Sequence, residues 1–201
     1  MGKIVISTNV TLDGVVQDPD GQEGFERGGW FHQFAGRQDL EQWVVNETQE
    51  TQSAEALLLG RRSFEWFASR APSMAERVSR RWADRMNSLP KYVVSSTLEH
   101  PQWVNTTVLG PDAVEQIAAL KHRVGGEILV YGSYQLVRTL ISQDLADELR
   151  LVVFPVALGA GVRLFDDAGR KKPVQLVEMR KIGDGLLHHT YRFAPSSPGS
   201  P

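Results

Sequence analysis

The stretch from Ile128 to Ile141, ILVYGSYQLVRTLI, constrains the fold most, because its pattern predicts a buried strand, a tight turn and a helix in immediate succession. Three apolar residues begin it, as in a strand covered on both faces. After Gly132 the apolar residues recur at helical spacing, and Ser133 occupies the position of an N-cap. A glycine there lets a ligand approach the backbone, and the first N–H groups of a helix can bind phosphate. The stretch predicts either an anion site or an ordinary strand-to-helix connection.

A second junction of the same kind follows the apolar strand predicted at 56–59. The strand runs into Gly60, Arg61, Arg62 and Ser63, and the helical pattern FEWFA begins directly afterwards. Two arginines at this position can pair with a phosphate through their planar fork, or they can simply face solvent. The recurrence of the junction in one chain favours the phosphate-binding interpretation.

The remaining pattern alternates strands with helices. Further strands are expected at 3–10, 91–96, 103–109 and 147–156, with a hairpin from 174–179 and 186–193. Further helices are expected at 37–52, 71–89, 113–124 and 133–143. This order predicts an α/β domain with a mainly parallel sheet and antiparallel strands at one end. Ligands of such sheets bind at the carboxyl ends of strands, where Asp13, Gly60, Ser95 and Gly132 are all expected.

Composition narrows the class of protein. The 201 residues fit one domain, expected at 1–193, followed by the tail APSSPGSP at 194–201, which has nothing to bury and is expected to be disordered. A net charge of −2 excludes a strongly basic nucleic-acid binder, and the absence of cysteine excludes a Cys-ligated metal site. The adjacent His188 and His189 should point to opposite faces of a strand, so no metal site is expected. With no signal peptide or long apolar run, the chain is expected to be cytoplasmic and away from membranes.

A glycine-rich segment at 17–29 predicts a long loop that serves as a lid or a binding loop. Trp30 and Phe31 follow it directly. These aromatic side chains either pack under the loop, which is the favoured interpretation, or form the wall of a site for a flat ligand.

Five segments, in this order, resemble the dihydrofolate reductase superfamily, and within it the reductase domain of bacterial riboflavin biosynthesis. They are TLDG at 11–14, LLLGRRSFE at 57–65, KYVVSS at 91–96, ILVYGSYQLVRTL at 128–140 and DELRLVVFPVALGAGVRLF at 147–165. The resemblance covers residues 3 to 193. It implies a three-layer α/β fold with helices on both faces of a mostly parallel sheet and an antiparallel C-terminal hairpin. It also implies the cofactor NADPH and a homodimer, for which the strand at 149–156 and the final hairpin are the expected interface.

The resemblance also implies which residues contact the cofactor. Arginines suit the extra ribose phosphate of NADPH, which favours it over NADH. The implied contacts to the phosphates are Gly60, Arg61, Arg62 and Ser63. Those to the adenosine end are Ser95 and Ser96. Those to the pyrophosphate are Gly132, Ser133, Tyr134, Gln135 and Leu136.

The substrate end departs from the family pattern. Riboflavin reductases typically carry an acidic residue before a glycine pair at the central turn, where this chain has Tyr131, Gly132 and Ser133. A different substrate is therefore expected. In dihydrofolate reductases an acidic residue of the first helix assists protonation, and Asp39 is the counterpart here. Asp13 and an ordered water are the other candidate proton donors.

These observations lead to the hypothesis of an NADPH-dependent reductase that transfers a hydride to a small heterocycle, pterin-like or pyrimidine-like. Its relatives by resemblance are dihydrofolate reductase and 5-amino-6-(5-phosphoribosylamino)uracil reductase. Candidate substrate contacts are Asp13, Trp30, Tyr131 and Phe165, although each aromatic can equally belong to the core. Two alternatives stay open: a non-catalytic nucleotide-binding or dimerising module, and a drug-resistance dihydrofolate reductase.

Overall fold

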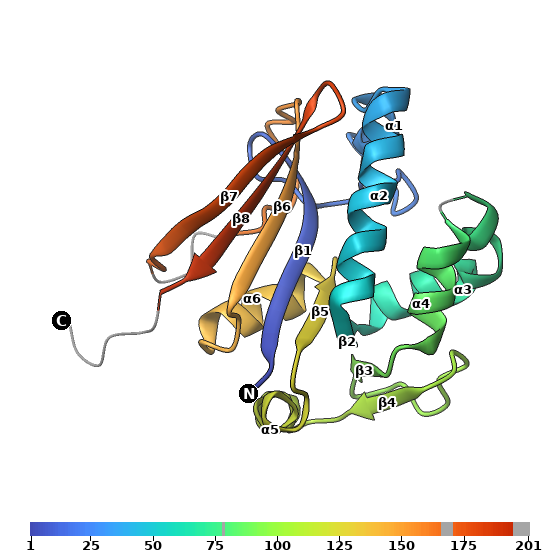
Figure 1. The fold of residues 1–201 in the computed structure, drawn as a ribbon, viewed down its shortest axis with the longest axis vertical. Coiled ribbons are helices and arrows are strands. Elements are labelled where there is room, and N and C mark those ends of the chain that lie inside the picture. Colours follow the sequence, from blue (N-terminus) through green and yellow to red (C-terminus); the bar gives the residue numbers. More distant parts are fainter. Residues whose placement is uncertain (78, 166–170, 195–201) are drawn as a thin grey trace.

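A single eight-stranded sheet organises the chain (Figure 1). The computed structural model describes residues 1–77, 79–165 and 171–194. The strands are β1 (Lys3–Thr11), β2 (Ala54–Gly60), β3 (Lys91–Val94), β4 (Thr106–Leu109), β5 (Glu127–Tyr131), β6 (Glu148–Phe154), β7 (Val174–Ile182) and β8 (Leu186–Phe193). Their order is β4-β3-β2-β5-β1-β6-β8-β7. The first six pair in parallel, whereas β8 is antiparallel to β6 and β7, which confirms the predicted sheet with its C-terminal hairpin.

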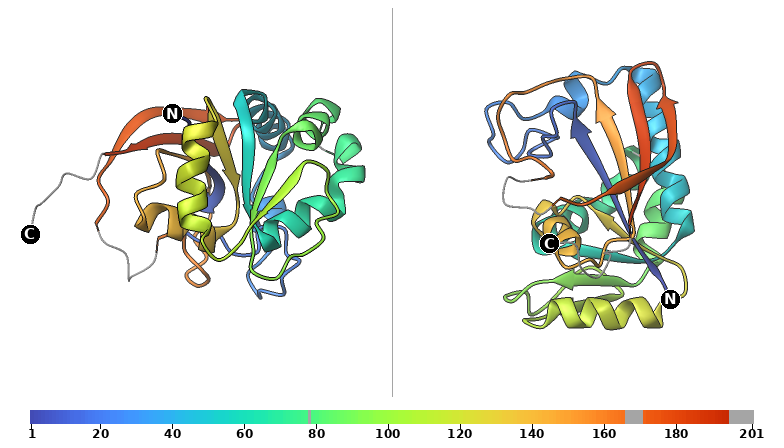
Figure 2. Two further views of the ribbon diagram at one scale, coloured as in Figure 1. Left: turned by 90° about the horizontal axis from the view of Figure 1, so that it is seen from below. Right: turned by 90° about the vertical axis from the view of Figure 1, so that its left-hand side faces the viewer.

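Helices cover both faces of the sheet (Figure 2). They are α1 (Trp30–Gln33), α2 (Arg37–Ser53), α3 (Arg61–Arg77), α4 (Arg80–Ser88), α5 (Ala113–Arg123) and α6 (Tyr134–Ser142). Side chains of α5 and α6 form one apolar core against the sheet, while those of α3 and α4 form another. Helix α2 lies on the same side as α3 and α4 (Figure 1). The predicted three-layer arrangement is therefore confirmed.

The central strands show why the apolar runs of the sequence become parallel strands. Leu57, Leu58 and Leu59 are completely buried, and they alternate between the core under α3 and α4 and the core under α5 and α6. A strand buried on both faces has no polar position to alternate with, so its sequence is continuously apolar.

The structure differs from the prediction between residues 61 and 89. The helix that starts after Gly60 continues to Arg77, and the helix expected at 71–89 is divided between α3 and α4. Ser79 is extended, and its hydroxyl accepts from the N–H of Trp82 at 3.3 Å, so it begins a new helix. Of the tail predicted at 194–201, all but Ala194 lies outside the described residues. No helix in the described ranges is long and apolar enough to span a bilayer.

Strands β2 and β5 lie side by side, but the helices that follow them go to opposite faces. Helix α3 packs with the core under α3 and α4, and α6 packs with the core on the other side. In α/β sheets, ligands bind beyond the carboxyl ends of two strands that diverge in this way, and we call this region of the present sheet the crevice. The carboxyl ends of β2 and β5 are Gly60 and Tyr131.

Candidate functional site

The two strand-glycine-helix junctions meet at this crevice. The N–H of Gly60 donates to the hydroxyl of Ser133 over 2.9 Å, which joins β2 to the start of α6. A Cβ added at Gly60 would lie 3.4 Å from the Cβ and Oγ of Ser133, and one added at Gly132 would lie 3.3 Å from Oγ of Ser63. Both glycines therefore allow the two junctions to approach closely.

The start of α6 has the properties of an anion site. Gly132 and Ser133 both adopt left-handed conformations, with φ of 55° and 59°. Ser133 is the N-cap residue of α6, as predicted, but its side chain makes no capping hydrogen bond, because its hydroxyl accepts from the N–H of Gly60 and donates to the carbonyl of Tyr131 at 3.1 Å. No described residue accepts from the N–H groups of the first three helical residues, Tyr134, Gln135 and Leu136. With no acidic residue in the first turn, these donors favour an anion.

Arg61 connects the first junction to the loop after β3. Its Nε lies 2.7 Å from Oε1 of Glu65, and its guanidinium also bonds the hydroxyl of Thr97. The Ser95 hydroxyl accepts from the N–H groups of Thr97 and Leu98, at 3.2 and 3.0 Å. Three predicted cofactor regions, the Gly60 and Gly132 junctions and the Ser95 loop, thus lie at one edge of the sheet.

The loop at 17–29 is organised by the buried carboxylate of Asp18, which accepts from the N–H groups of Glu23 and Phe25 at 2.9 and 3.0 Å. The loop docks on α3, because Nε1 of Trp66 donates to Asp20 at 2.8 Å. Burial and the charge of Asp18 raise the pKa of Glu23, while the positive charge of Arg62 opposes this rise. The loop therefore lies near the exposed Arg62, and its role as a lid stays a prediction.

Asp13, a predicted proton donor, is tied into a turn. Its carboxylate accepts from the hydroxyl of Thr11 at 2.7 Å and from the N–H groups of Leu158 and Gly159 at 3.1 and 2.7 Å. Partial burial acts to raise the pKa of Asp13, but these hydrogen bonds outweigh it and lower the pKa to about 2. An ionised carboxylate has no proton to donate, so its environment favours a structural role.

The carboxylate of Asp39, the other predicted proton donor, is also poorly suited to donate a proton. Its Oδ2 accepts from the N–H of Gly36 at 2.8 Å, and its Oδ1 accepts from the N–H groups of Asp184 and Gly185 at 2.6 and 2.9 Å. Burial alone would raise the pKa of Asp39, but these bonds and the charge of Lys181 lower it. Asp39 therefore fixes the β7–β8 turn to the start of α2.

The aromatic candidates for a substrate pocket do not lie together. Trp30 is completely buried; its Nε1 donates to the carbonyl of Gln17 at 2.9 Å and its ring packs edge-on against Phe154 at 5.2 Å. Tyr131 is buried in a different core, under α3 and α4, whereas Phe165 is exposed. For Trp30 and Tyr131, the core-packing interpretation is correct.

A buried polar cluster under α2 was not predicted. Glu47 and Glu50 face the sheet, and Oε1 of Glu50 lies 3.5 Å from Nε2 of His188. Burial and the charge of Glu50 raise the pKa of Glu47 well above its usual range, so this carboxyl holds its proton to higher pH than a free glutamate does. Neither oxygen of Glu50 has a hydrogen-bond partner among the described residues. The only sequence signal is the largely polar pattern of α2, because the facing residues come from distant strands.

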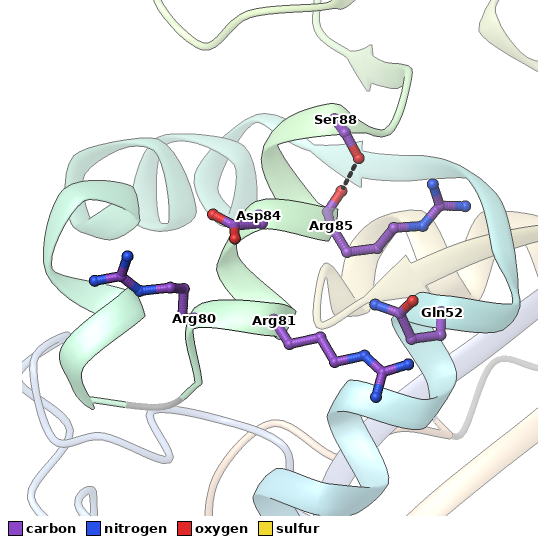
Figure 3. A pocket seen from close by; sticks show the side chains of 6 residues that line it. All are labelled: Gln52, Arg80, Arg81, Asp84, Arg85 and Ser88. Carbon is purple, nitrogen blue, oxygen red and sulfur yellow. Dashed lines mark hydrogen bonds between the residues drawn. The ribbon is translucent and has the colours of Figure 1, made fainter.

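A cavity of about 620 Å³ lies elsewhere, beside α4 (Figure 3). It is lined by Gln52, Arg80, Arg81, Asp84, Arg85 and Ser88. Arg85 is engaged within the fold, since it donates to the carbonyls of Thr51 and Ala54 at 3.2 and 2.6 Å. Ala54 begins β2, so this cavity lies at the amino end of that strand, opposite the crevice.

Comparisons with known proteins agree with this architecture. Residues 2–188 match the family model of the RibD C-terminal domain. Two uncharacterized proteins of Bacillus subtilis (strain 168), YyaP and YwjB, are each 25% identical to this chain. The match to YyaP covers 95% of this chain and 95% of YyaP, and the match to YwjB covers 94% of this chain and 98% of YwjB. A Shewanella sp. PV-4 protein named for riboflavin biosynthesis has a similar structure, with a TM-score of 0.70, 21% identity and coverage of 96% and 99%. A pyrimidine reductase-like protein from Corynebacterium diphtheriae has a TM-score of 0.55, 12% identity and coverage of 96% and 92%.

Proposed function

Since this chain belongs to the RibD C-terminal domain family, we propose that it is an NADPH-dependent reductase of a small heterocyclic acceptor, pterin-like or pyrimidine-like. The observation that carries the proposal is the meeting of two glycine junctions at the β2–β5 crevice, beside the cations of Arg61 and Arg62. A dinucleotide needs such a set, because its phosphates require N–H donors, cations and close backbone approach.

The chain's residues fit the cofactor in the following way. The free N–H groups at the start of α6 would hold the pyrophosphate, and Gly132 would give it access to the backbone. Arg61 and Arg62 would pair with the ribose phosphate that distinguishes NADPH from NADH. Ser95 and Ser96 would contact the adenosine end.

Bound NADPH would supply the hydride, so the protein has to orient the nicotinamide and the acceptor and to exclude water from the transfer. Asp13 and Asp39 are held as carboxylates by hydrogen bonds. We therefore assign the proton to an ordered water rather than to either residue. Separate Asp13→Asn and Asp39→Asn variants that fold should retain turnover of an acceptor, and loss of turnover without loss of NADPH binding would contradict this assignment.

The first test is a titration with NADPH, NADP⁺ and NADH, followed by tryptophan fluorescence. Arg61 and Arg37 form a matched pair, because each begins a helix and each pairs with a glutamate four residues later. Arg61→Gln should weaken NADPH binding about 10- to 100-fold, the value of a charge-assisted hydrogen bond, and should affect NADH much less. Arg37→Gln should bind like the parent protein.

The outcomes separate the hypotheses. No binding of any dinucleotide, or equal binding by both arginine variants, would contradict the phosphate site. NADPH that binds but is never oxidised in a screen of pterins and pyrimidines would favour the non-catalytic nucleotide-binding module. Loss of absorbance at the reduced-nicotinamide band that depends on an added acceptor would support the reductase.

A further inference from the structure

The cavity beside α4 is separate from the crevice, and its lining is strongly cationic. Three arginines, one aspartate and two uncharged polar residues line its volume of about 620 Å³: Arg80, Arg81, Arg85, Asp84, Gln52 and Ser88. Three positive charges and one negative charge give the lining a net charge of +2, although the whole chain carries −2. Small-molecule sites have volumes of roughly 300–1,000 Å³, and a cationic concave surface attracts anions. The cavity therefore has the size and charge of a site for a small polar anion.

Two of the three arginines lie on one side of α4. Arg81 and Arg85 are four positions apart, so they are neighbours on the helix surface, with Cβ atoms about 5–6 Å apart. In Figure 3 the side chains of Arg81, Gln52 and Arg85 lie on the same side of α4, whereas those of Arg80 and Asp84 turn to the other side. The carboxylate of Asp84 therefore does not lie between the two neighbouring guanidinium groups.

These arginines lack the acidic partners that comparable helical arginines have. Arg37 and Arg61 also lie in a first helical turn, and each pairs with a glutamate four residues later. Among the described residues, no ion pair involves Arg80, Arg81 or Arg85. Neighbouring cations repel each other, and a cation in the first turn of a helix opposes the helix dipole. An anion bound between Arg81 and Arg85 would relieve both unfavourable interactions.

Arg85 is held in position by the fold itself. Its Nε donates to the carbonyl of Thr51 at 3.2 Å, and its Nη2 donates to the carbonyl of Ala54 at 2.6 Å. A guanidinium group has five N–H donors, so three donors of Arg85 stay available after these two bonds. A cation that is already fixed loses little conformational entropy when it binds a ligand. Arg85 therefore offers a preorganised half of an anion site, and the exposed Arg81 offers the other half.

We propose that this cavity is a second anion site, in which Arg81 and Arg85 bind one phosphate group. A phosphate dianion has enough oxygens to accept from two guanidinium forks, and its charge balances the +2 of the lining. The amide of Gln52 adds a neutral donor, and the rest of the cavity suits the polar body of a phosphorylated small molecule. The site lies at the amino end of β2, so it is independent of the crevice and of the dinucleotide proposed to bind there.

Nuclear magnetic resonance of the isotope-labelled full-length protein tests the site. Inorganic phosphate and ribose 5-phosphate are the two probes, each added at constant ionic strength. Both should cause saturable shifts of the Nε–H signals of Arg81 and Arg85, with dissociation constants of about 1 mM or below. Tighter binding of ribose 5-phosphate would identify a phosphorylated molecule as the ligand, and equal binding would identify free phosphate. Absence of a saturable shift in α4, or equal shifts with chloride, would overturn the proposal.

Three matched variants locate the binding. Arg81→Gln should raise the dissociation constant measured at α4 at least about 10-fold, because one charge-assisted contact is lost. Arg37→Gln changes an exposed arginine of another first turn and should bind like the parent. Arg61→Gln should change only the shifts that phosphate causes at residues 134–136 of the crevice. An unchanged dissociation constant in Arg81→Gln, or an equal loss in Arg37→Gln, would overturn the site.

Thermal unfolding distinguishes a binding role of Arg81 from a structural role. Without phosphate, Arg81→Gln should melt at or slightly above the temperature of the parent, because the repulsion of Arg85 and the helix dipole is removed. Phosphate at about 10 mM should raise the melting temperature of the parent by about 3 °C and that of Arg81→Gln by less than about 1 °C. Equal increases in the two proteins would show that phosphate acts elsewhere on the molecule and would contradict the proposal.

Discussion

The two faces of strands β6, β8 and β7 are built from alternate residues of the same strands, yet they differ in whether polar or apolar side chains are buried. Toward α2, the polar side chains of Glu148, Arg150 and His188 are mostly buried. On the opposite face, which points away from α2, Met179 and Leu187 are apolar and exposed. The contrast teaches that a side chain on a sheet is buried only where another element covers its face. An apolar residue on an uncovered face can therefore be exposed.

We call the face toward α2 the covered face, and its charged side chains form ion pairs with one another. Nη2 of Arg150 lies 2.9 Å from Glu127 and 2.7 Å from Glu148, and Lys3 reaches the same two carboxylates at 3.5 and 3.6 Å. Buried ion pairs lose much of their attraction to desolvation, so they add little net stability. Removing one partner is costly, because the other charges stay buried without compensation.

The largest expected effect follows from Arg150. Arg150→Met should lower the free energy of unfolding by about 3 kcal/mol, because two buried carboxylates lose their buried cation and keep only the half-exposed Lys3. Urea unfolding measures this. Arg37→Met removes the 91% exposed partner of Glu41 and should change stability by less than about 0.5 kcal/mol. Equal effects of the two substitutions would mean that the covered face is not electrostatically distinct from the surface.

A smaller effect is expected where the covered face is anchored. Asp39→Ala removes the acceptor of three backbone N–H groups and should cost about 2 kcal/mol, with faster hydrogen exchange in the β7–β8 turn. Glu41→Ala, an exposed change in the same helix, is the control and should leave that exchange unchanged. Unaltered protection of Asp184 and Gly185 in the Asp39 variant would show that the hairpin is held by other contacts.

Glu47 tests the covered face through pH. The pKa of Glu47 in the folded protein is raised above its usual value, so the folded protein is most stable when Glu47 is protonated. The free energy of unfolding therefore declines as the pH rises through that pKa. Glu47→Gln cannot ionise. It should therefore gain stability relative to the parent as the pH rises from about 4.5 to about 8. A stability difference that is the same at both pH values would mean that Glu47 is already ionised in the fold.

The smallest effect is expected on the face of β6, β8 and β7 that points away from α2. Leu187→Ser, at a 40% exposed position, should change the free energy of unfolding by no more than about 0.5 kcal/mol, as for ordinary surface positions. Urea unfolding of the parent and the variant gives the difference. A loss near 2 kcal/mol would show that another part of the chain already covers this face, and the contrast between the two faces would not hold.

The parts of the fold that could be predicted rest on local patterns. The continuously apolar runs at 56–59 and 128–130 predicted central parallel strands, and the glycines after them predicted the junctions that meet at the crevice. The turn signal at 182–185 predicted the hairpin. In each case neighbouring residues carry the information, because strand burial and turn chemistry are decided within a few positions.

What could not be predicted depends on residues far apart in the chain. Asp39 is an acidic residue near a helix start by sequence, and only its contact with residues 184 and 185 makes it an anchor of the hairpin. Glu47 and Glu50 of α2 point toward the sheet, so α2 does not have the apolar inward face of an ordinary amphipathic helix. Their partner His188 lies more than a hundred positions away in the sequence, so no local pattern indicates the cluster.

The bond between Gly60 and Ser133 has a consequence for how the chain folds. The two residues are 73 positions apart, and the segments between them form α3, α4, β3, β4, α5 and β5. Closing so long a loop costs chain entropy, which slows folding. The two junctions can meet only after β5 has paired with β2. An unfinished chain that ends before β5 therefore has half of the crevice and no site. Any molecule that binds there requires β5 to be in place beside β2, so occupancy of the crevice reports that this pairing has formed.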